Sequence, residues 1–393
     1  MMLRYIRSKA EAEEELKKIK VHKDAINILS PKMFYFNIKV NDLPPQDAII
    51  MKQEMLCCGG DMAIAYNALP PKGMKSDAII MGNLRQIEWF IERLKRQYKR
   101  LAKIGENIEE LLYKINRRME MKIGNRKFIF GKRTYIMGVL NVTPDSFYDG
   151  GKYFDYEKAI ERAKEMEKEG ADIIDVGGES SRPFSKRIDA KEEKKRVIPV
   201  IEAIAKEIKI PVSIDTYKPS VAKAAIEAGA SLINDITGLR KGVDRIAAEY
   251  DVPVVIMHMK GRPETMQINP SYEDVNAEIL EFLQRRVDKA IKVGIEENKI
   301  IIDPGIGFGK RQKDNIRILS HLIEFKSLGY PILIGASRKS FIGNILGLPP
   351  EERLEGSLAA AALAIANGAD IIRCHDVMAT KRAAMVADEI ARV

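Results

Sequence analysis

The chain has 393 residues, which is too long for one ordinary domain but suits a barrel of roughly 250 residues with a smaller domain. Its composition, 46% hydrophobic and 31% charged with a net charge of +9, is that of a soluble globular protein with enough apolar residues for a large core. No apolar run reaches the length of a membrane span or of a signal peptide, so we expect a cytoplasmic protein with no membrane partner.

Residues 1–130 lack a regular alternation of strands and helices, and we predict that they form a separate small α/β domain of unknown role. The boundary is expected near Gly124–Arg133. The predicted elements are a helix at 8–20, a strand at Phe34–Val40, and a long helix at Leu84–Met121 with a break at Gly105.

The same 130 residues carry the net charge of the chain, because they hold 25 Lys and Arg against 16 Asp and Glu. A basic domain could bind nucleic acid or an anionic substrate. Its densest basic run, residues 93–100, has helical periodicity, which favours a solvated helix face. We therefore do not expect nucleic acid as a partner.

From Thr134 onward, short apolar runs of strand length alternate with longer segments of helical periodicity. The eight predicted strands are Tyr135–Asn141, Ala171–Gly177, Pro211–Thr216, Ser231–Ile236, Pro253–Met259, Lys299–Pro304, Pro331–Ala336 and Ala369–His375. Each is mostly apolar on both faces, as in parallel strands between a barrel interior and a helix layer. The helices predicted between them include Tyr156–Glu169, Pro219–Ala228, Tyr272–Val293 and Leu354–Ala366. Residues 131–393 are therefore predicted to form a closed (β/α)₈ TIM barrel.

Polar residues occur at the ends of the predicted strands, where the active sites of such barrels lie. They include Asn141, Asp175, Asp215, Asn234, Asp235, His258, Asp303, Lys339 and His375. A structural hydrogen bond could explain any one of them, but it does not explain all eight strands together.

These residues divide into two chemical groups. Asp215, Asn234 and Asp303 offer carboxylates and a carboxamide, which suit a flat heterocycle with several N–H donors and an acceptor. Phe308 or Met257 could cover the face of such a ring.

The second group follows strands seven and eight, the usual phosphate corner of this fold. It contains Arg338, Lys339, Arg373 and His375, with a helix predicted to start near Val377 and Arg182 able to reach in from the second loop. A heterocycle joined to a phosphate group fits both groups.

Eight motifs from Thr134 to Val393 resemble those of the dihydropteroate synthase family. In chain order they are NVTPDSFYDGG, GGESSRPFS, SIDT, NDI, MHMKG, DPGIGFGK, SRKS and RCHD. The resemblance implies a Mg²⁺-dependent transferase of alkyl groups other than methyl. Such an enzyme displaces pyrophosphate from 6-hydroxymethyl-7,8-dihydropterin diphosphate with the amine of p-aminobenzoate.

The resemblance also implies a role for individual residues. Catalytic residues would be Asp303, Lys339, Arg182 and Asp149, the last in the mobile first loop. The pterin would contact Asp215, Asn234, Asp303, Lys339, Met257 and Phe308. Pyrophosphate would contact Asn141, Arg373 and His375, and Asn141 would also contact the magnesium. The acceptor would lie against Ser181, Arg182, Pro183 and Ser340.

The basic N-terminal extension is absent from bacterial folate enzymes and resembles that of archaeal members. Such relatives are thought to build methanopterin, so the acceptor is either p-aminobenzoate or 4-(β-D-ribofuranosyl)aminobenzene 5′-phosphate. Family members are commonly dimeric, and a homodimer is therefore expected.

Two other functions stay open. One is a methyltransferase domain that takes a methyl group from a methylated tetrahydropterin, and the other is a non-catalytic binder of pterin or nucleic acid. The complete SRKS and RCHD motifs favour the synthase over the first, and the intact first and second loops favour it over the second.

Overall fold

A computed structural model describes residues 9–68, 74–142, 156–180, 187–240 and 242–392 of the chain. The chain folds into two compact units, Met1–Tyr113 and Lys114–Val393. Each unit has a hydrophobic core of its own.

The first unit is a small α/β fold. Its sheet has the order β1-β3-β2 and is antiparallel. Its elements are α1 (Lys9–Lys18), α2 (Lys23–Leu29), η1 (Ser30–Lys32), β1 (Tyr35–Leu43), α3 (Pro45–Cys57), β2 (Asp61–Ala63), η2 (Tyr66–Ala68), β3 (Ser76–Asn83), α4 (Leu84–Lys95) and α5 (Lys99–Asn116). Apolar side chains of α3, α4, α5 and β3 fill its core, among them Met51, Met55, Ile80, Phe90 and Leu101.

The predicted long helix at Leu84–Met121 is wrong in two respects. The interruption lies between Lys95 and Lys99, and α5 ends at Asn116. Gly105 lies inside α5, where an added Cβ would come within 3.1 Å of the Leu94 Cβ. Gly105 therefore lets the two helices approach closely and does not break α5.

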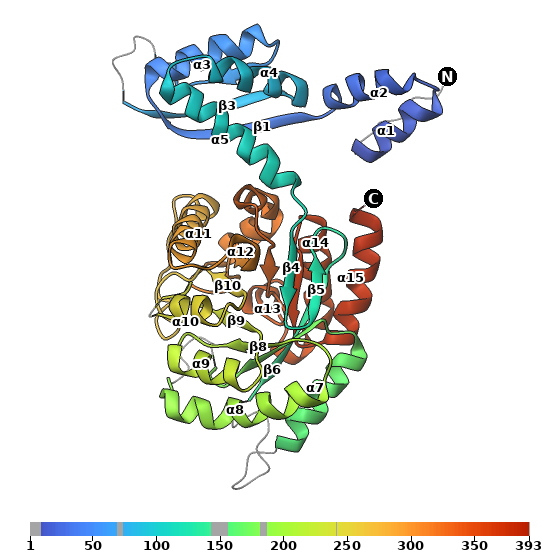
Figure 1. The fold of residues 1–393 in the computed structure, drawn as a ribbon, viewed down its shortest axis with the longest axis vertical. Helices are drawn as coiled ribbons and strands as arrows, with labels where there is room; N and C mark the ends of the chain where they lie inside the picture. Colours follow the sequence, from blue (N-terminus) through green and yellow to red (C-terminus); the bar gives the residue numbers. More distant parts are fainter. Residues whose placement is uncertain (1–8, 69–73, 143–155, 181–186, 241, 393) are drawn as a thin grey trace. The chain divides into compact units, whose positions relative to one another are not determined.

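The second unit contains eight parallel strands around one axis (Figure 1). They are β6 (Tyr135–Asn141), β7 (Ile173–Gly177), β8 (Val212–Asp215), β9 (Leu232–Asp235), β10 (Val254–Met257), β11 (Ile300–Asp303), β12 (Leu333–Ile334) and β13 (Ile371–Cys374). The pairing order is β11-β10-β9-β8-β7-β6-β13-β12, and a parallel bridge between Ile302 and Ile332 joins the two ends. The predicted TIM barrel is confirmed, and each predicted strand contains an observed one.

Helices lie outside the strands, as the alternating pattern predicts (Figure 1). They are α7 (Tyr156–Glu169), α8 (Ala190–Glu207), α9 (Pro219–Glu227), α10 (Val243–Glu249), α11 (Val275–Lys292), α12 (Gln312–Ser320), α13 (Ser340–Leu346), α14 (Leu354–Ala366) and α15 (Val377–Ala391). The short 3₁₀ helices are η3 (Glu297–Lys299), η4 (Leu322–Leu328) and η5 (Pro350–Glu352). None of the helices in the described ranges is long and apolar enough to cross a membrane.

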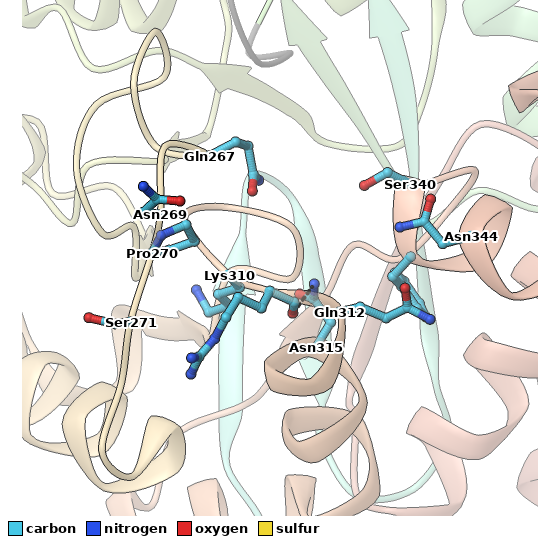
Figure 2. Close-up of a pocket in the computed structure, with 11 residues that line it drawn as sticks. Gln267, Asn269, Pro270, Ser271, Lys310, Gln312, Asn315, Ser340 and Asn344 are labelled. Atoms are coloured by element: carbon cyan, nitrogen blue, oxygen red, sulfur yellow. Dashed lines mark hydrogen bonds between the residues drawn. The ribbon is translucent and has the colours of Figure 1, made fainter.

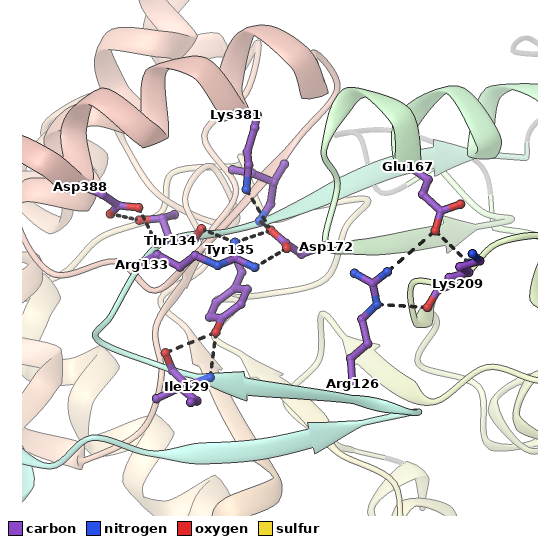
Figure 3. Close-up of polar contacts among 11 residues, drawn as sticks. Arg126, Ile129, Arg133, Thr134, Tyr135, Glu167, Asp172, Lys209, Lys381 and Asp388 are labelled. Carbon is purple, nitrogen blue, oxygen red and sulfur yellow. Dashed lines mark hydrogen bonds and ion pairs between the residues drawn. The ribbon is translucent and has the colours of Figure 1, made fainter.

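A hairpin of β4 (Glu120–Ile123) and β5 (Arg126–Ile129) packs against the first residue of β6 (Figure 3). The rings of Phe128 and Phe130 lie 4.7 Å and 5.5 Å from that of Tyr135, whose hydroxyl accepts a 2.8 Å hydrogen bond from the Ile129 N–H. The second unit therefore begins at Lys114, before the boundary predicted near Gly124–Arg133.

The same end of the barrel is held by ion pairs and hydrogen bonds (Figure 3). Arg133 donates to both carboxylate oxygens of Asp172 at 3.0 and 2.7 Å, and Thr134 donates to Asp388 twice at 2.7 Å. These residues precede the strands or lie in α15, so the N-terminal ends of the strands serve stability. The active site is expected at the carboxyl ends of the strands, as is general in this fold.

Candidate active site

A row of residues in register lies at the carboxyl ends of β6 to β9. Asn141 pairs with Gly177, Gly177 with Asp215, and Asp215 with Asn234. A Cβ at Gly177 would lie 3.8 Å from Oδ1 of Asn141 and 3.9 Å from Oδ2 of Asp215. Since Gly177 has no side chain, the amide of Asn141 and the carboxylate of Asp215 lie close together across it.

Arg373 of β13 joins this row to a buried carboxylate. Its guanidinium donates to Oδ2 of Asp175 at 2.6 Å and to Oδ2 of Asp215 at 2.8 Å. The Asn234 amide donates to the same Asp175 oxygen at 3.0 Å. Asp175 has no exposed surface, and among the described residues its Oδ1 has no hydrogen-bond donor. We call Asp175, Asp215, Asn234 and Arg373 the carboxylate network.

Burial shifts the pKa values of the ionisable groups in this region. It raises the pKa of Asp215 to about 7, against the opposing charge of Arg373 and with support from the charge of Asp175. Burial also raises the pKa of Asp303, which the charge of Lys339 and the N–H of Gly305 oppose. The pKa of Lys339 is lowered to about 8 by burial, against the charge of Asp303. The site therefore holds ionisable groups that can gain or lose charge near neutral pH.

Asp303 and Lys339 lie beside a small apolar cluster. Asp303 ends β11 opposite Met257 of β10, and Met257 is buried in a cluster apart from the barrel core. Phe308 packs against that cluster, and the Lys339 ammonium lies 4.5 Å from the centre of its ring. Lys339 also donates to the backbone oxygen of Ile306. Met257 and Phe308 thus lie together next to Asp303 and Lys339.

The loop after β11 passes directly over the loop after β10. Gly305 has φ +72°, and a Cβ there would lie 2.0 Å from the backbone oxygen of His258. Gly309 has φ +63°, with a Cβ 2.2 Å from the backbone oxygen of Lys260. Only glycine fits both the left-handed conformation and this contact. The GIGFG sequence therefore shapes the loop that carries Phe308.

His258 was among the predicted strand-end residues, but the structure does not bring it to the site. It is buried, with its Nδ1 2.9 Å from the Lys310 ammonium and its ring 4.9 Å from that of Phe282. Burial and the charge of Lys310 lower the pKa of His258 to about 2. His258 is therefore a neutral structural histidine.

The buried His258 predicts a pH dependence of stability. Because its pKa is lower in the folded than in the unfolded chain, its contribution is present above about pH 6.5 and is lost as the pH falls. Asp215, with a raised pKa, acts in the opposite direction between about pH 4 and 7. We therefore expect the difference in unfolding free energy between wild type and His258→Gln to shrink by about 1 kcal/mol per pH unit from pH 6.5 to 4.5.

Urea denaturation across this pH range measures that difference. His22→Gln, which replaces an exposed histidine by the same residue, glutamine, is the matched control. If the difference in unfolding free energy between wild type and His258→Gln stays constant from pH 6.5 to 4.5, His258 takes up a proton in the folded protein.

The residues of the predicted phosphate corner have different partners in the structure. His375 contacts Ser337, with its Nδ1 3.0 Å from the serine hydroxyl. Arg338 is paired with Asp376 at 2.7 and 2.9 Å, and it also donates to backbone oxygens at residues 350 and 351. The charge of Arg338 is thus neutralised by Asp376. Arg373 points instead to the carboxylates described above.

Ser340 starts α13 and is exposed on the wall of a cavity of about 540 Å³ (Figure 2). Four further predicted site residues, Asp149, Ser181, Arg182 and Pro183, lie outside the described residues.

Comparison with known proteins gives the family. Residues 137–375 match the pterin binding enzyme family. The chain is 50% identical over 275 residues to a dihydropteroate synthase of Clostridium beijerinckii, covering 69% of this chain and 100% of that protein. The chain belongs to the dihydropteroate synthase family.

Two further relatives of the family extend this result. A dihydropteroate synthase of Xanthomonas albilineans, solved in complex with 7,8-dihydropteroate, matches with a TM-score of 0.63 and 41% identity, over 70% of this chain and 99% of that one. The probable bifunctional folylpolyglutamate synthase/dihydropteroate synthase of Haloferax volcanii is 38% identical over 343 residues, or 84% of this chain and 40% of that protein.

The magnesium that family membership implies has limited protein ligands here. Within the described ranges, no group of three or more His, Cys, Asp or Glu side chains could hold a metal ion. A lone carboxamide such as that of Asn141 still fits Mg²⁺, because this ion often takes one or two protein oxygens together with substrate phosphates and water. The donor set suits a Mg²⁺ ion that arrives with a diphosphate.

Two features of this dihydropteroate synthase fold are not predicted from the sequence. Asp175 is expected there only as a polar residue of the second strand, without a role, yet it holds both Arg373 and Asn234. Asn315 accepts a hydrogen bond from the Gly307 N–H at 2.7 Å and so supports the glycine loop from α12. The sequence signal that could have indicated the role of Asp175 is its position as a charged residue inside an apolar strand.

Proposed function

We propose that the chain joins 6-hydroxymethyl-7,8-dihydropterin diphosphate to an arylamine and releases pyrophosphate. The observation that carries this proposal is the carboxylate network at the carboxyl ends of the strands, with Asp303 and Lys339 beside it. A pterin ring has several N–H donors and several acceptors, and these groups offer partners for both.

Each half of the substrate has its own proposed residues. The oxygens of Asp215 and Asp303 accept hydrogen bonds from pterin N–H groups, while Asn234 and Lys339 donate to pterin acceptors. Support comes from the burial of Asn234 and Asp303. A buried polar group without a hydrogen-bond partner is costly, and a hydrogen bond to a charged group such as the Asp303 carboxylate is strong. Met257 and Phe308 cover the ring on its apolar side.

The diphosphate is proposed to lie between Asn141, Arg373 and His375, near the N-terminus of α15. The side chain of Asp376 at the N-cap of α15 makes no capping hydrogen bond, which leaves amide groups of the first turn for an anion. Arg373 would then contact the diphosphate directly and the pterin half through its hydrogen bond to Asp215. When bound with the substrate, Mg²⁺ supplies charge neutralisation for the leaving pyrophosphate.

The reaction itself needs little proton transfer by the protein. The C–O bond to the diphosphate breaks, its electron pair leaves with pyrophosphate, and positive charge develops on the pterin methylene. Asp303 is proposed to offset that charge. The neutral amine then forms the C–N bond and gives its proton to solvent. Asp149 and Arg182 are proposed to help enclose these steps.

The acceptor is p-aminobenzoate or 4-(β-D-ribofuranosyl)aminobenzene 5′-phosphate. The Haloferax volcanii protein aligns with 84% of the chain, more than the second unit alone can supply, so the likeness reaches into the N-terminal unit. This supports an archaeal type of synthase with an N-terminal extension. The first unit, Met1–Tyr113, is proposed to be a separate basic domain, and the second unit, with its β4–β5 hairpin, the catalytic barrel.

A homodimer in the cytoplasm is proposed as well. Helices α14 and α15 pack together and carry exposed apolar side chains, with Leu363, Met385 and Ile390 exposed to 63%, 59% and 74%. Exposed apolar patches of this kind often mark protein interfaces.

The proposed reaction can be tested by its pyrophosphate. We expect pyrophosphate release from dihydropterin diphosphate only when Mg²⁺ and an arylamine are both present, followed by a coupled pyrophosphatase assay. The same mixture with the amine omitted is the control. Release that does not need the amine, or no release with either acceptor, would contradict the proposal.

A further inference from the structure

A second group of charged side chains lies at the carboxyl ends of β7 and β8, outside the carboxylate network. The ammonium of Lys218, which follows β8, donates hydrogen bonds to Glu179, which follows β7, and to Glu193 in the first turn of α8. The side chains of Lys218, Glu179 and Glu193 are 14%, 12% and 1% exposed. We call these three residues the lysine cluster.

The lysine cluster holds the loop that joins β8 to α9 and begins directly after Asp215. The Tyr217 hydroxyl donates to Oε1 of Glu179 at 2.8 Å, while Lys218 donates to Oε2 of the same carboxylate. The backbone N–H of Lys218 donates to the hydroxyl of Thr216 at 3.2 Å. The residues that follow the proposed pterin carboxylate of Asp215 are therefore fixed by contacts within the loop and with Glu179.

The ring of Tyr217 belongs to the small apolar cluster beside the site. Tyr217 and Met257 are both buried in this cluster, and Phe308 packs against it. Met257 and Phe308 are the two residues proposed to cover the pterin ring. Tyr217 therefore joins the proposed pterin wall through its ring and the lysine cluster through its hydroxyl.

The backbone before Glu179 is held on α8. A Cβ at Gly178 would lie 2.6 Å from Cγ1 of Val197 and 3.1 Å from Cγ of Glu193, so the absence of a side chain lets this segment pass directly over the helix. Arg196 of α8 donates to the backbone oxygen of Gly178 at 3.2 Å. The carboxylate of Glu179 thus extends to Tyr217 from a backbone that is itself fixed.

Stability alone is a weak reason for burying the charges of the lysine cluster. Taking charges out of water is costly, and apolar side chains of similar volume often replace a buried ion pair without loss of stability. In this barrel the ion pair of Arg133 and Asp172 stabilises the N-terminal ends of the strands. The lysine cluster lies at the carboxyl ends, where this fold places its active site. A positioning role accounts for both the buried charges and their location.

We propose that Tyr217 forms part of the wall of the pterin site and that Lys218 positions it through Glu179. The inference rests on the proposed function, because the pterin is the substrate of that reaction. Lys218 keeps two carboxylates together and so keeps Glu179 in the orientation that accepts the Tyr217 hydroxyl. Without the ammonium, the like charges of Glu179 and Glu193 repel each other, and the ring of Tyr217 loses its fixed position.

The test measures binding of 6-hydroxymethyl-7,8-dihydropterin to the full-length chain by calorimetric titration, which does not depend on turnover. Lys218→Met is expected to raise the Kd about tenfold, the effect of a misplaced contact group. Lys218→Arg keeps the charge and should bring the Kd back to within about threefold of wild type. Tyr217→Phe removes only the hydroxyl and should raise the Kd about threefold, the effect of one lost neutral hydrogen bond.

Lys326→Met is the matched control for a loss of stability without a change at the site. Lys326 donates to the fully buried carboxylate of Asp370 at 2.5 Å, and Asp370 directly precedes β13, at the N-terminal end of the barrel. Like Lys218→Met, this variant should lower the free energy of unfolding in urea, since both leave a buried carboxylate without its lysine. The Kd for the pterin should stay within about twofold of wild type, because the N-terminal ends of the strands serve stability.

The inference is overturned if Lys218→Met binds the pterin as tightly as Lys326→Met, or if Lys218→Arg binds it as weakly as Lys218→Met. An unchanged Kd for Tyr217→Phe also overturns it, and this small substitution decides the matter if Lys218→Met does not fold. If wild type binds the pterin but releases no pyrophosphate with any arylamine, the proposed function fails, whereas the Kd values of the variants still decide the positioning role.

Discussion

Replacing Arg373 with alanine is expected to lower the free energy of unfolding of the barrel by about 3–5 kcal/mol. Its guanidinium is the partner of Asp175, which is fully buried, and of Asp215. Removing one partner of a buried ion pair leaves an uncompensated charge, which is the costly case. Protonation of Asp215 should offset part of the loss at low pH, since its pKa, already about 7, would rise without Arg373.

Urea denaturation followed by far-UV circular dichroism measures this effect. The only tryptophan, Trp89, lies in the first unit, so tryptophan fluorescence would report on the wrong unit. Arg285→Ala is the matched control because its ion pair with Glu281 is exposed, and exposed pairs contribute little. If the decrease in unfolding free energy for Arg373→Ala is as small as that for the control, the carboxylate network is not formed.

Ligand binding to Arg373→Ala provides a second measurement. Because Arg373 contacts the carboxylate proposed to hold the pterin, the variant should weaken binding of both the pterin and its diphosphate. His375→Ala should weaken only the diphosphate, since His375 is proposed to contact that half of the substrate alone and its Nδ1 lies 3.0 Å from the Ser337 hydroxyl. Calorimetric titration with both ligands checks this, and selective loss of the pterin alone in either variant would contradict the assignment.

Asp303→Asn is expected to lower kcat/KM by about 10²-fold or more. The substitution keeps the shape of the side chain but removes its charge and replaces an acceptor oxygen by a donor. Asp303 is buried beside Lys339, where a charge-assisted hydrogen bond to the substrate contributes about 1.5–3 kcal/mol. The charge that offsets the developing cation is lost as well. Steady-state pyrophosphate release measures both effects.

Asp235→Asn is the matched control for Asp303→Asn. Asp235 is equally buried at the end of β9, but it accepts hydrogen bonds from the N–H and hydroxyl of Thr237 at 2.6 and 2.7 Å. It should affect stability and leave the KM for the pterin substrate nearly unchanged. If both variants lose activity equally, the effect of Asp303 is structural.

The barrel could be predicted well because its strands are apolar on both faces and longer segments of helical periodicity or apolar, alanine-rich sequence separate them. The predicted helices Tyr156–Glu169 and Leu354–Ala366 have the observed bounds of α7 and α14. In the first unit, Gly105 misled the prediction, because a glycine that permits close packing of two helices has the same local appearance as one that breaks a helix.

The site could be predicted only in part, because a residue's position at a strand end does not give the direction of its side chain. Asn234 and Asp235 are neighbours, yet one points to Asp175 and the other to its own loop. Arg338 follows β12 and Arg373 lies in β13, but a contact with Asp376 removes Arg338 from the site. Partners distant in the chain decide these outcomes, and local sequence does not contain them.

The contacts of Arg373 also bear on how the protein folds. They join β13 to β7 and β8 across 198 and 158 residues of chain, so they form only after the first and last parts of the barrel have met. Contacts between residues so far apart in the sequence form late in folding. The chain must first lose the entropy of closing the loop before the contact contributes any stabilising free energy. On the ribosome, the carboxylate network cannot be completed until β13, near the end of the chain, has emerged.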